Sequence, residues 1–403
     1  MNTRIVATGL GVISSLGIGK DTFWNAVCKG MSGISPVTSF DTSAFPTHRG
    51  GEVKDFNPLE FVGQRKASAF GRSSLFAVSA ACLAARDANI DFSGAHDRAG
   101  VCLGTTMGET RLFERLNEAW SKKGHQSIEP GLLPQIPPYS MAAHVASEFG
   151  LRGPNYLIPT ACAAGNYAIG YACDLIKDGT VDLMLAGGVD AFSRIAFCGF
   201  NRLLAVAPEV CQPFDKNRKG MMVGEGAGIV LLETLEHARS RGATIYAEVL
   251  GYGVSCDAFH MTAPAHQGIK EALCATLRAS SLKIGDVDYL NAHGTGTPAN
   301  DKEECRAIKE VFGDTYKKLA VSSIKSMLGH TMGAASALEA IACCLTLKYG
   351  IIPPTINFST PDPDCDIDCV PNIARCRDVR VALNNAFAFG GNNSCLALAK
   401  FPS

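Results

Sequence analysis

The sequence predicts an α/β protein built from two similar halves, because one pattern of strand, helix and glycine-containing loop occurs twice. The motif GLGV at residues 9–12 follows an apolar strand, and GYGV at residues 251–254 follows a strand-like stretch in the middle of the chain. A helical pattern comes after each motif. A strand that ends in a Gly/Thr loop then follows, at residues 104–106 and 294–295. Strands that alternate with helices indicate a mixed or parallel sheet covered on both faces.

Each half also contains an Ala-rich segment with a helical pattern that starts at a chemically useful residue. The first segment starts at Cys162 and the second at His330. We therefore expect an N-terminal half of residues 1–240 and a C-terminal half of residues 241–403. Residues 108–138 interrupt the repeat and are interpreted as an insertion.

Composition and charge narrow the class of protein. The 403 residues are 47% hydrophobic and include 41 glycines, which allows a sizeable core with many tight turns. The net charge of −1, from 37 basic and 38 acidic side chains, argues against a general nucleic-acid-binding protein. We find no secretion signal and no apolar run long enough to span a bilayer. Sixteen cysteines without such a signal predict reduced thiols in the cytoplasm.

The segment PTACAAG at residues 159–165 contains the strongest candidate nucleophile, Cys162. At the start of a helix, the helix dipole and unpaired backbone N–H groups favour a thiolate, which would make Cys162 nucleophilic near neutral pH. The small neighbouring residues would let a bulky substrate approach. The alternative is a buried structural cysteine, as most free cysteines are.

Two histidines and a glycine-rich loop complete a candidate site. His293 follows a strand and enters a Gly/Thr loop, a position where sites on α/β sheets usually lie. His330 opens the second Ala-rich helix, predicted from residue 333 to about residue 348. The loop NAFAFGGNN at residues 385–393 has adjacent glycines that let backbone amides approach a ligand, as an oxyanion hole requires.

These segments resemble the four site motifs of the β-ketoacyl-acyl-carrier-protein synthases, in particular the elongating Cys-His-His type of fatty acid and type II polyketide synthesis. The motifs contain Cys162, His293, Lys325 with His330, and Phe389, in the order of the family, and the resemblance covers nearly the whole chain. It implies the thiolase-like fold, in which two duplicated halves stack as five α-β-α-β-α layers. It also implies a dimer with shared pockets, either a homodimer or a heterodimer.

The resemblance further implies a decarboxylative Claisen condensation. Cys162 would take an acyl chain from an acyl carrier protein, and malonyl carrier protein would then bind and lose carbon dioxide. Neutral His293 and His330 would donate N–H groups to the enolate, and the carbanion would attack the acyl-Cys162 carbonyl. The backbone N–H groups of Cys162 and Phe389 would hold the oxyanion. We expect no metal and no organic cofactor for this chemistry.

Five polar residues match supporting positions of the family. Lys325, with Glu339, is expected to organise the site rather than to act as a base. Asp301 is expected to cap or anchor its loop, since acidic residues suit the first turn of a helix. Thr295 and Thr297 would bind the amides of the pantetheine arm; alternatively, each hydroxyl satisfies its own loop backbone.

Access to the site and acyl chain length have their own candidates. The family residue that matches Phe389 swings to admit acyl chains, and Gly390 and Gly391 would permit that motion. A plain core phenylalanine is the alternative. In the family, a side chain near Phe113 lies at the floor of the pocket, reached across the dimer. A bulky residue there predicts short or rigid unsaturated acyl chains.

An acidic carrier protein predicts a basic rim near the entrance of the pocket. Four residues match that rim by position: Arg65, Lys66, Arg72 and Arg202. The alternative is ordinary surface charge. Asn392 departs from the Thr or His that usually follows Gly-Gly in the family, which leaves both ordinary fatty acid elongation and a specialised polyene or other lipid pathway open.

Three cysteines near the C-terminus form a candidate metal site. Cys365, Cys369 and Cys376 are spaced by four and seven residues. A structural zinc site normally has four ligands and a shorter second spacing, and the sequence offers no obvious fourth ligand. We therefore predict three thiols without a metal.

Rival classes differ from this sequence at identifiable points. A thiolase would have a second cysteine motif near the C-terminus, and a starter-type ketosynthase would carry Asn in place of His330. The separation of 131 residues between Cys162 and His293 suits a papain-like hydrolase, but that family's signature around the cysteine is missing. A catalytically weak, chain-length-factor-like subunit of a heterodimer remains the alternative, although such subunits lose the nucleophilic cysteine and Cys162 is present.

Overall fold

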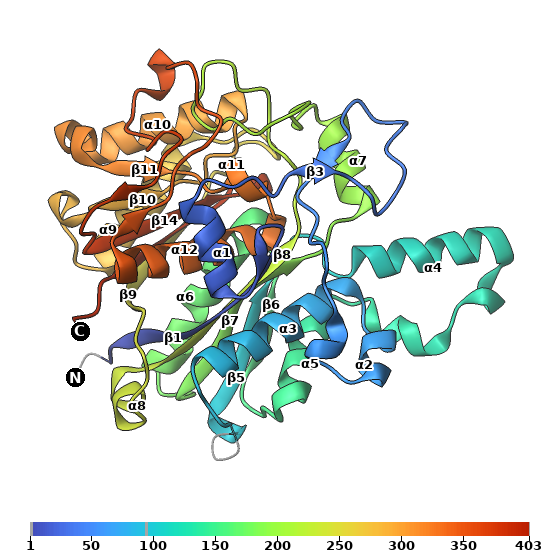
Figure 1. Cartoon of the computed structure of the whole chain (residues 1–403). Helices are drawn as coiled ribbons and strands as arrows, with labels where there is room; N and C mark the ends of the chain where they lie inside the picture. Colours follow the sequence, from blue (N-terminus) through green and yellow to red (C-terminus); the bar gives the residue numbers. More distant parts are fainter. Residues whose placement is uncertain (1–2, 93–95, 403) are drawn as a thin grey trace.

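The computed structural model describes residues 3–92 and 96–402, and one large mixed sheet runs through it (Figure 1). The strand order is β11-β10-β14-β15-β9-β1-β8-β7-β5-β6, and β2 pairs with β1. The N-terminal strands of this sheet are β1 (Ile5–Ser14), β2 (Gly17–Ile18), β5 (Ala99–Gly104), β6 (Asn155–Ile158), β7 (Leu183–Asp190) and β8 (Gly226–Thr234). The C-terminal strands are β9 (Ala247–Cys256), β10 (Tyr289–Asn291), β11 (Ala320–Ser322), β14 (Val381–Phe387) and β15 (Asn392–Ala399). Two small hairpin-like sheets are β3 (Ser35–Pro36) with β4 (Arg49–Gly50), and β12 (Ile351–Ile352) with β13 (Arg375–Cys376).

The large sheet consists of two five-stranded units with the same topology, which confirms the predicted duplication. In the N-terminal unit, β5 pairs in parallel with β6 and β7, and β8 and β1 follow as antiparallel strands. In the C-terminal unit, β10 pairs in parallel with β11 and β14, and β15 and β9 follow as antiparallel strands. The units meet through a short antiparallel pairing of residues 5–7 of β1 with residues 247–249 of β9. The division between residues 240 and 241 stays a prediction; it falls at the end of the helix that joins β8 to β9.

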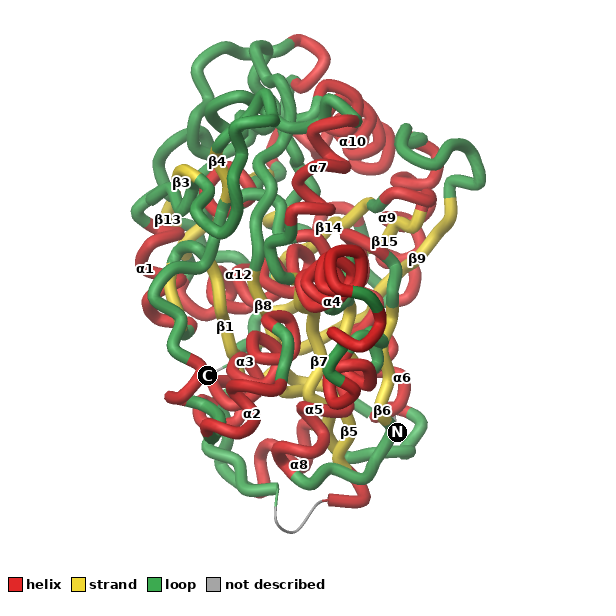
Figure 2. The backbone as a smooth tube through the Cα atoms, turned by 90° about the vertical axis from the view of Figure 1, so that its right-hand side faces the viewer, coloured by secondary structure: helices red, strands yellow, loops and turns green. Residues whose placement is uncertain are grey.

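Helices complete the five predicted layers (Figures 1 and 2). Two central helices, α6 and α12, pack against each other and contact strands of the N-terminal unit; α12 also packs on β14 of the C-terminal unit. On the outer faces, α3 and α5 cover the N-terminal unit, and α9 with α10 covers the C-terminal unit. The helices are α1 (Lys20–Cys28), α2 (Gln64–Ala69), α3 (Arg72–Asp87), α4 (Thr110–Lys123), α5 (Ser140–Phe149), α6 (Ala164–Lys177), α7 (Arg194–Arg202), α8 (Leu235–Ser240), α9 (His266–Ala279), α10 (Pro298–Phe312), α11 (Lys325–Leu328) and α12 (Ala335–Tyr349).

The two glycine motifs lie inside strands, and not after them as the sequence analysis predicted. A Cβ atom on Gly11 in β1 would lie 1.8 Å from the carbonyl oxygen of Ala80 in α3. A Cβ atom on Gly253 in β9 would lie 2.4 Å from the backbone nitrogen of Thr276 in α9. The motifs therefore do not end the strands; they let the outer helix of each half approach the sheet closely.

Both Ala-rich helices are preceded by a single 3₁₀ turn. The turn η5 (Ala161–Ala163) contains Cys162 and leads into α6, as predicted. The turn η8 (Met332–Ala334) starts two residues after His330 and leads into α12, which begins two residues later than predicted. The first residue of each turn has a left-handed backbone, with φ of 50° at Ala161 and 54° at Met332. The two turns are therefore local structural counterparts.

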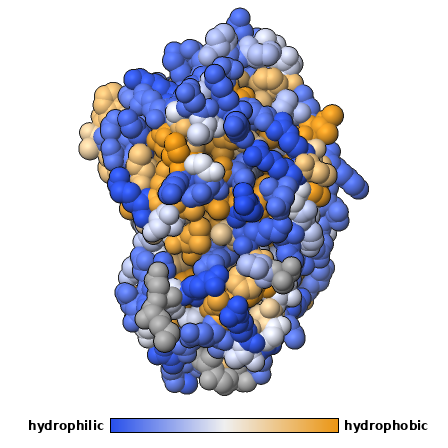
Figure 3. All heavy atoms as spheres, turned by 90° about the vertical axis from the view of Figure 1, so that its left-hand side faces the viewer, coloured by the Kyte–Doolittle hydropathy of each residue, from blue (hydrophilic) through white to orange (hydrophobic). Residues whose placement is uncertain are grey.

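The segment 108–138 forms the predicted insertion. It contains α4, which projects from the body of the molecule (Figures 1 and 2). On the opposite side of the molecule, the surface is mostly hydrophilic, with an apolar area near the middle of that face (Figure 3). None of the helices in residues 3–92 and 96–402 combines the length and the apolar character that crossing a bilayer requires.

Candidate active site

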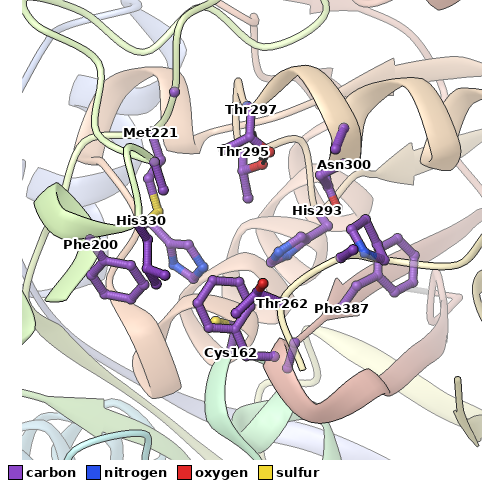
Figure 4. Close-up of a pocket in the computed structure, with 18 of the residues that line it drawn as sticks. Cys162, Phe200, Met221, Thr262, His293, Thr295, Thr297, Asn300, His330 and Phe387 are labelled. Atoms are coloured by element: carbon purple, nitrogen blue, oxygen red, sulfur yellow. Dashed lines mark hydrogen bonds between the residues drawn. The ribbon is translucent and has the colours of Figure 1, made fainter. Parts of the chain in front are cut away.

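A cavity of about 330 Å³ brings together Cys162, His293 and His330, which are far apart in the sequence (Figure 4). Cys162 comes from the N-terminal half, and both histidines come from the C-terminal half. Phe200 on α7 and Phe387 at the end of β14 provide apolar walls. The cavity therefore lies at the carboxyl ends of strands from both halves, as sites on such sheets usually do.

Cys162 lies at the entry to α6, in the middle of η5, and is only 7% exposed. Burial raises the pKa of the Cys162 thiol to about 12, and the nearby charge of Lys325 opposes this rise only in part. The expectation of a thiolate near neutral pH is therefore wrong for the resting protein. Burial therefore favours the protonated thiol of Cys162, whose proton must leave during attack.

His293 follows β10 and is held by its backbone. The carboxylate of Glu304 in α10 accepts hydrogen bonds from the backbone N–H groups of His293 and Gly294, both at 2.8 Å. Burial lowers the pKa of the His293 imidazole well below its ordinary value, and the charges of Lys325 and His330 lower it further. His293 is therefore neutral, and its Nδ1 has no hydrogen-bond partner within the described part of the chain.

His330 is fixed both by its backbone and by its ring. Its backbone N–H donates to the carbonyl of Met222 at 2.6 Å, and its Nδ1 accepts a hydrogen bond from the backbone N–H of Met332 at 3.1 Å. Burial, followed by the charge of Lys325, lowers the pKa of His330 well below its ordinary value. Since Nδ1 is an acceptor and the ring is neutral, the proton lies on Nε2, which is then a hydrogen-bond donor. The rings of His293 and His330 meet edge to face, with centroids 5.4 Å apart.

A buried ion pair lies behind the histidines. Lys325, at the start of α11, donates a charge-assisted hydrogen bond to the carboxylate of Glu339 in α12, and both side chains are almost fully buried. Burial raises the pKa of Glu339 to about 7, against the effect of Lys325. Because Lys325 also lowers the pKa of both histidines, its position fits the predicted role of an organiser.

The Gly/Thr loop after His293 lines the opposite wall of the cavity (Figure 4). The hydroxyls of Thr295 and Thr297 hydrogen-bond to each other at 2.8 Å. The Thr295 hydroxyl also accepts a hydrogen bond from the backbone N–H of Thr297 at 3.4 Å, so the contact to the loop backbone that the alternative expected is present for Thr295. Both side chains still line the cavity. Asp301 anchors this loop, because its carboxylate accepts hydrogen bonds from the backbone N–H groups of Gly296 at 3.2 Å and Phe214 at 2.9 Å.

Phe389 lies at the mouth of the cavity, 37% exposed, with its ring centroid 6.0 Å from that of Phe200. Gly390 and Gly391 have left-handed backbones, with φ of 81° and 77°, which favour glycine. The backbone N–H of Gly390 donates to the carbonyl of Met261 at 2.8 Å. The loop that contains Phe389 and Gly390 is therefore hydrogen-bonded to a second loop at the mouth of the cavity, which contains Met261.

That second loop was missed by the sequence analysis. His260, Met261 and Thr262 line the cavity. The carboxylate of Asp257 accepts a hydrogen bond from the side chain of Asn393 at 2.7 Å and so joins the loop to β15. No catalytic motif marks this stretch, and only the proline and glycine at residues 264 and 268 signalled a loop.

The candidates for chain length and carrier docking lie outside this cavity. Phe113 on α4 is 49% exposed. Lys66 forms an ion pair with Glu148 at 2.5 Å, and the guanidinium of Arg72 pairs with the buried carboxylate of Glu225 at 2.7 Å. Arg72 is thus held by an internal partner, whereas Arg65 and Arg202 are exposed.

The three cysteines of the candidate metal site differ in burial. Cys365 and Cys369 are buried, and Cys376 is exposed on β13. Within residues 3–92 and 96–402, no three His, Cys, Asp or Glu side chains form a group that could hold a metal ion.

Comparisons with known proteins give the family. Residues 2–238 match the model of the β-ketoacyl synthase N-terminal domain, and residues 246–359 match that of the C-terminal domain. The chain is 40% identical over 409 residues to 3-oxoacyl-(acyl-carrier-protein) synthase 2 of Staphylococcus aureus, covering 99% of each protein. It is 43% identical over 399 residues to nodulation protein E of Rhizobium meliloti, covering 98% of this chain and 99% of that protein.

Solved structures agree. The ishigamide ketosynthase/chain length factor is similar with a TM-score of 0.96 and 44% identity, over the full length of both chains. A β-ketoacyl synthase from Burkholderia phymatum is similar with a TM-score of 0.92 and 34% identity, over 99% of this chain and all of the other. The fold is therefore the thiolase-like fold that the sequence predicted. The chain belongs to the β-ketoacyl synthase family of acyltransferases.

Proposed function

We propose that this chain is an elongating β-ketoacyl-acyl-carrier-protein synthase, which condenses an acyl-enzyme thioester with malonyl carrier protein in fatty acid or related type II polyketide or polyene lipid synthesis. The observation that carries this proposal is the single cavity shared by Cys162 and two neutral histidines. Full-length similarity to 3-oxoacyl-(acyl-carrier-protein) synthase 2 supports the reaction class.

The first step is acyl transfer to Cys162. Its Sγ attacks the thioester carbonyl, a new C–S bond forms, and the thiol of the carrier protein leaves with the proton that Cys162 gives up. Because burial favours the protonated thiol of Cys162 at rest, proton removal accompanies attack, and the proton passes to the sulfur of the leaving carrier thiol. The backbone N–H groups of Cys162 and Phe389 are the proposed donors to the oxyanion.

The second step is decarboxylation and carbon–carbon bond formation. The C–C bond to the malonyl carboxylate breaks, carbon dioxide leaves, and its electron pair forms an enolate on the thioester. The Nε2–H of His330 and an N–H of His293 stabilise the enolate oxygen. The carbanion then attacks the acyl carbonyl, the Cys162–acyl bond breaks as the β-ketoacyl carrier product forms, and the Cys162 sulfur takes up a proton from solvent to return to the thiol.

Carrier docking and access complete the proposal. Arg202 lies beside the exposed Leu203 and Leu204, which line the mouth of the cavity, and is the rim candidate best placed to meet an acidic carrier protein. A structure similar to this chain, with a TM-score of 0.93 and 32% identity, is that of a type II polyketide ketosynthase with its acyl carrier protein. Thr295 and Thr297 are positioned to meet the pantetheine arm once their mutual hydrogen bond opens, and Phe389 would move to admit it. We place this chemistry in the cytoplasm.

Phe113 keeps its proposed role only through a dimer. Exposed on α4, it cannot close the floor of the cavity in its own chain, but it can reach a second subunit. A heterodimer is a specific alternative, because the similar structure with 44% identity is a ketosynthase paired with a chain length factor. In that case this chain would be the ketosynthase or, as the second candidate, a catalytically weak partner.

The test is intact-mass spectrometry of the purified protein after incubation with a panel of acyl carrier proteins. An acyl adduct that disappears in Cys162→Ala supports the proposal, and the accepted chain lengths report the pocket. Cys376→Ala is a matched control, since this thiol is exposed and does not line the cavity. Failure to form any adduct, with or without candidate partner subunits, would refute the catalytic role.

A further inference from the structure

Asp190 is a buried carboxylate for which neither the motifs nor the proposed reaction has a role. It is the last residue of β7 and is 0% exposed. Its carboxylate accepts four hydrogen bonds: from the Thr105 hydroxyl at 2.8 Å, and from the backbone N–H groups of Thr106 at 2.7 Å, Met107 at 2.8 Å and Gly333 at 2.6 Å. The first three donors follow β5 in the N-terminal half, whereas Gly333 is in η8 of the C-terminal half.

The hydrogen bond from Gly333 connects Asp190 to the turn that contacts His330. Met332 precedes Gly333 in the same turn, and its backbone N–H is the donor to Nδ1 of His330. Met332 also has a left-handed φ of 54°, a conformation that costs a non-glycine residue about 1 kcal/mol or more unless contacts hold it. The carboxylate of Asp190 therefore holds the turn in the conformation that aims the Met332 N–H at the imidazole.

The turn is also packed closely against the N-terminal half. A Cβ on Gly333 would lie 2.5 Å from the Cα of Thr105, and a Cβ on Gly188 in β7 would lie 2.1 Å from the carbonyl oxygen of Gly333. The turn thus rests against the backbones of two N-terminal strands and their loops. It also lies beside η5, which carries Cys162.

The charge of Asp190 does not help the nucleophile. It adds to the rise in the pKa of the Cys162 thiol, after the larger effects of burial and of Lys325. Burial of Asp190 itself raises its pKa to about 6, despite the four hydrogen bonds. Because Asp190 disfavours the Cys162 thiolate, its contribution to the site must come from its hydrogen bonds.

Resting on the roles proposed above for Cys162 and His330, we propose that Asp190 is a positioning residue that links the two halves and orients the His330 imidazole through the turn 332–333. It fixes the tautomer of His330 with the proton on Nε2, where that proton faces the enolate. The decarboxylation step should therefore depend on Asp190, whereas nucleophilic attack by Cys162 should not.

The experiment separates these two steps in Asp190→Asn. We expect the kcat of malonyl-carrier-protein decarboxylation to fall by roughly 10- to 100-fold, with the KM changed less than about threefold, since misplacement of one catalytic group costs rates of this size. Alkylation of Cys162 by iodoacetamide should be as fast as in the unmodified protein, or faster, because a nearby negative charge is lost. Unchanged decarboxylation, or equal losses in both assays, would overturn the proposal.

Two further measurements keep the test independent of folding. Glu52→Gln is the matched control, because Glu52 is a buried carboxylate that anchors the backbone N–H groups of Thr38 and Ser39 away from the cavity. It should leave both assays unchanged. In the unmodified protein, ¹⁵N NMR of labelled histidines should show His330 protonated on Nε2, and protonation on Nδ1 would overturn the proposal. If the unmodified protein forms no acyl adduct and decarboxylates nothing, the proposed function fails instead.

Discussion

The two halves of the molecule share a topology but use it differently. In each half a 3₁₀ turn with a left-handed first residue leads into a central helix, and the two helices, α6 and α12, pack together. In the N-terminal half the second residue of the turn is Cys162, which lines the cavity. In the C-terminal half the second residue is Gly333, which packs against Thr105 and donates its N–H to Asp190.

Under the function proposed above, this difference divides one reaction between the two copies of the fold. One turn presents the nucleophile at a helix start, where attack on a thioester is possible. The corresponding residue of the C-terminal turn is Gly333, and its lack of a side chain lets the two halves pack closely. His330 lies just before this turn. His293 comes from the same half, at the end of β10. In this proposal, covalent capture belongs to the N-terminal half and enolate stabilisation to the C-terminal half.

The largest expected effect comes from removing a C-terminal group and measuring the chemistry of each half. His293→Ala should lower malonyl decarboxylation by about 10²- to 10³-fold, the typical cost of losing one donor to a developing oxyanion. Acyl transfer to Cys162, followed by intact mass, should continue, since His293 is not the nucleophile. His48→Ala is the control, because this histidine is exposed and does not line the cavity. Equal loss of both steps in His293→Ala would show that the halves do not divide the reaction.

A second test asks whether the two turns are interchangeable. Gly333→Ala should lower the free energy of unfolding by about 1–3 kcal/mol, because the new Cβ would overlap the backbone of Thr105. Urea unfolding measures this loss. Gly285→Ala is the matched control, since a Cβ there would meet nothing within 4 Å. If Gly333→Ala is as stable as the control, the glycine does not distinguish the C-terminal turn from the N-terminal one.

Much of this division was predictable from the sequence, because motifs and strand patterns are local. The duplication, the helix starts near Cys162 and His330, and the family could be read from spacing and residue type. The protonation state of Cys162 could not, since the pKa of its thiol depends chiefly on burial in the folded chain, which a local motif does not reveal. Asp190 was missed for the same reason: an aspartate at a strand end has no motif, and its four donors converge only in the folded chain.

A third test removes the charge of Lys325, which affects the pKa of both histidines. Lys325 lowers the pKa of His293 and His330, so Lys325→Met should raise both pKa values toward the ordinary value for histidine. Protonation of His330 would place a proton on Nδ1, facing the Met332 N–H donor, and break its orientation. The acid limb of the decarboxylation pH profile should therefore move to higher pH. An unmoved limb would contradict this; Lys400→Met, in an exposed ion pair, controls for loss of a lysine.

The smallest expected effect concerns Thr297, whose hydroxyl is already satisfied by Thr295. If the loop only stabilises itself, Thr297→Val should change stability and leave the KM for malonyl carrier protein unaltered. If the hydroxyl turns to the pantetheine arm, the KM should rise while acylation of Cys162 by a small acyl thioester without that arm stays constant. We expect the second result, with a rise equivalent to about 1 kcal/mol, or roughly fivefold, as for one neutral hydrogen bond. Comparing the two substrates decides between them, because only the full carrier substrate reaches along this loop, and a purely structural defect would affect both equally.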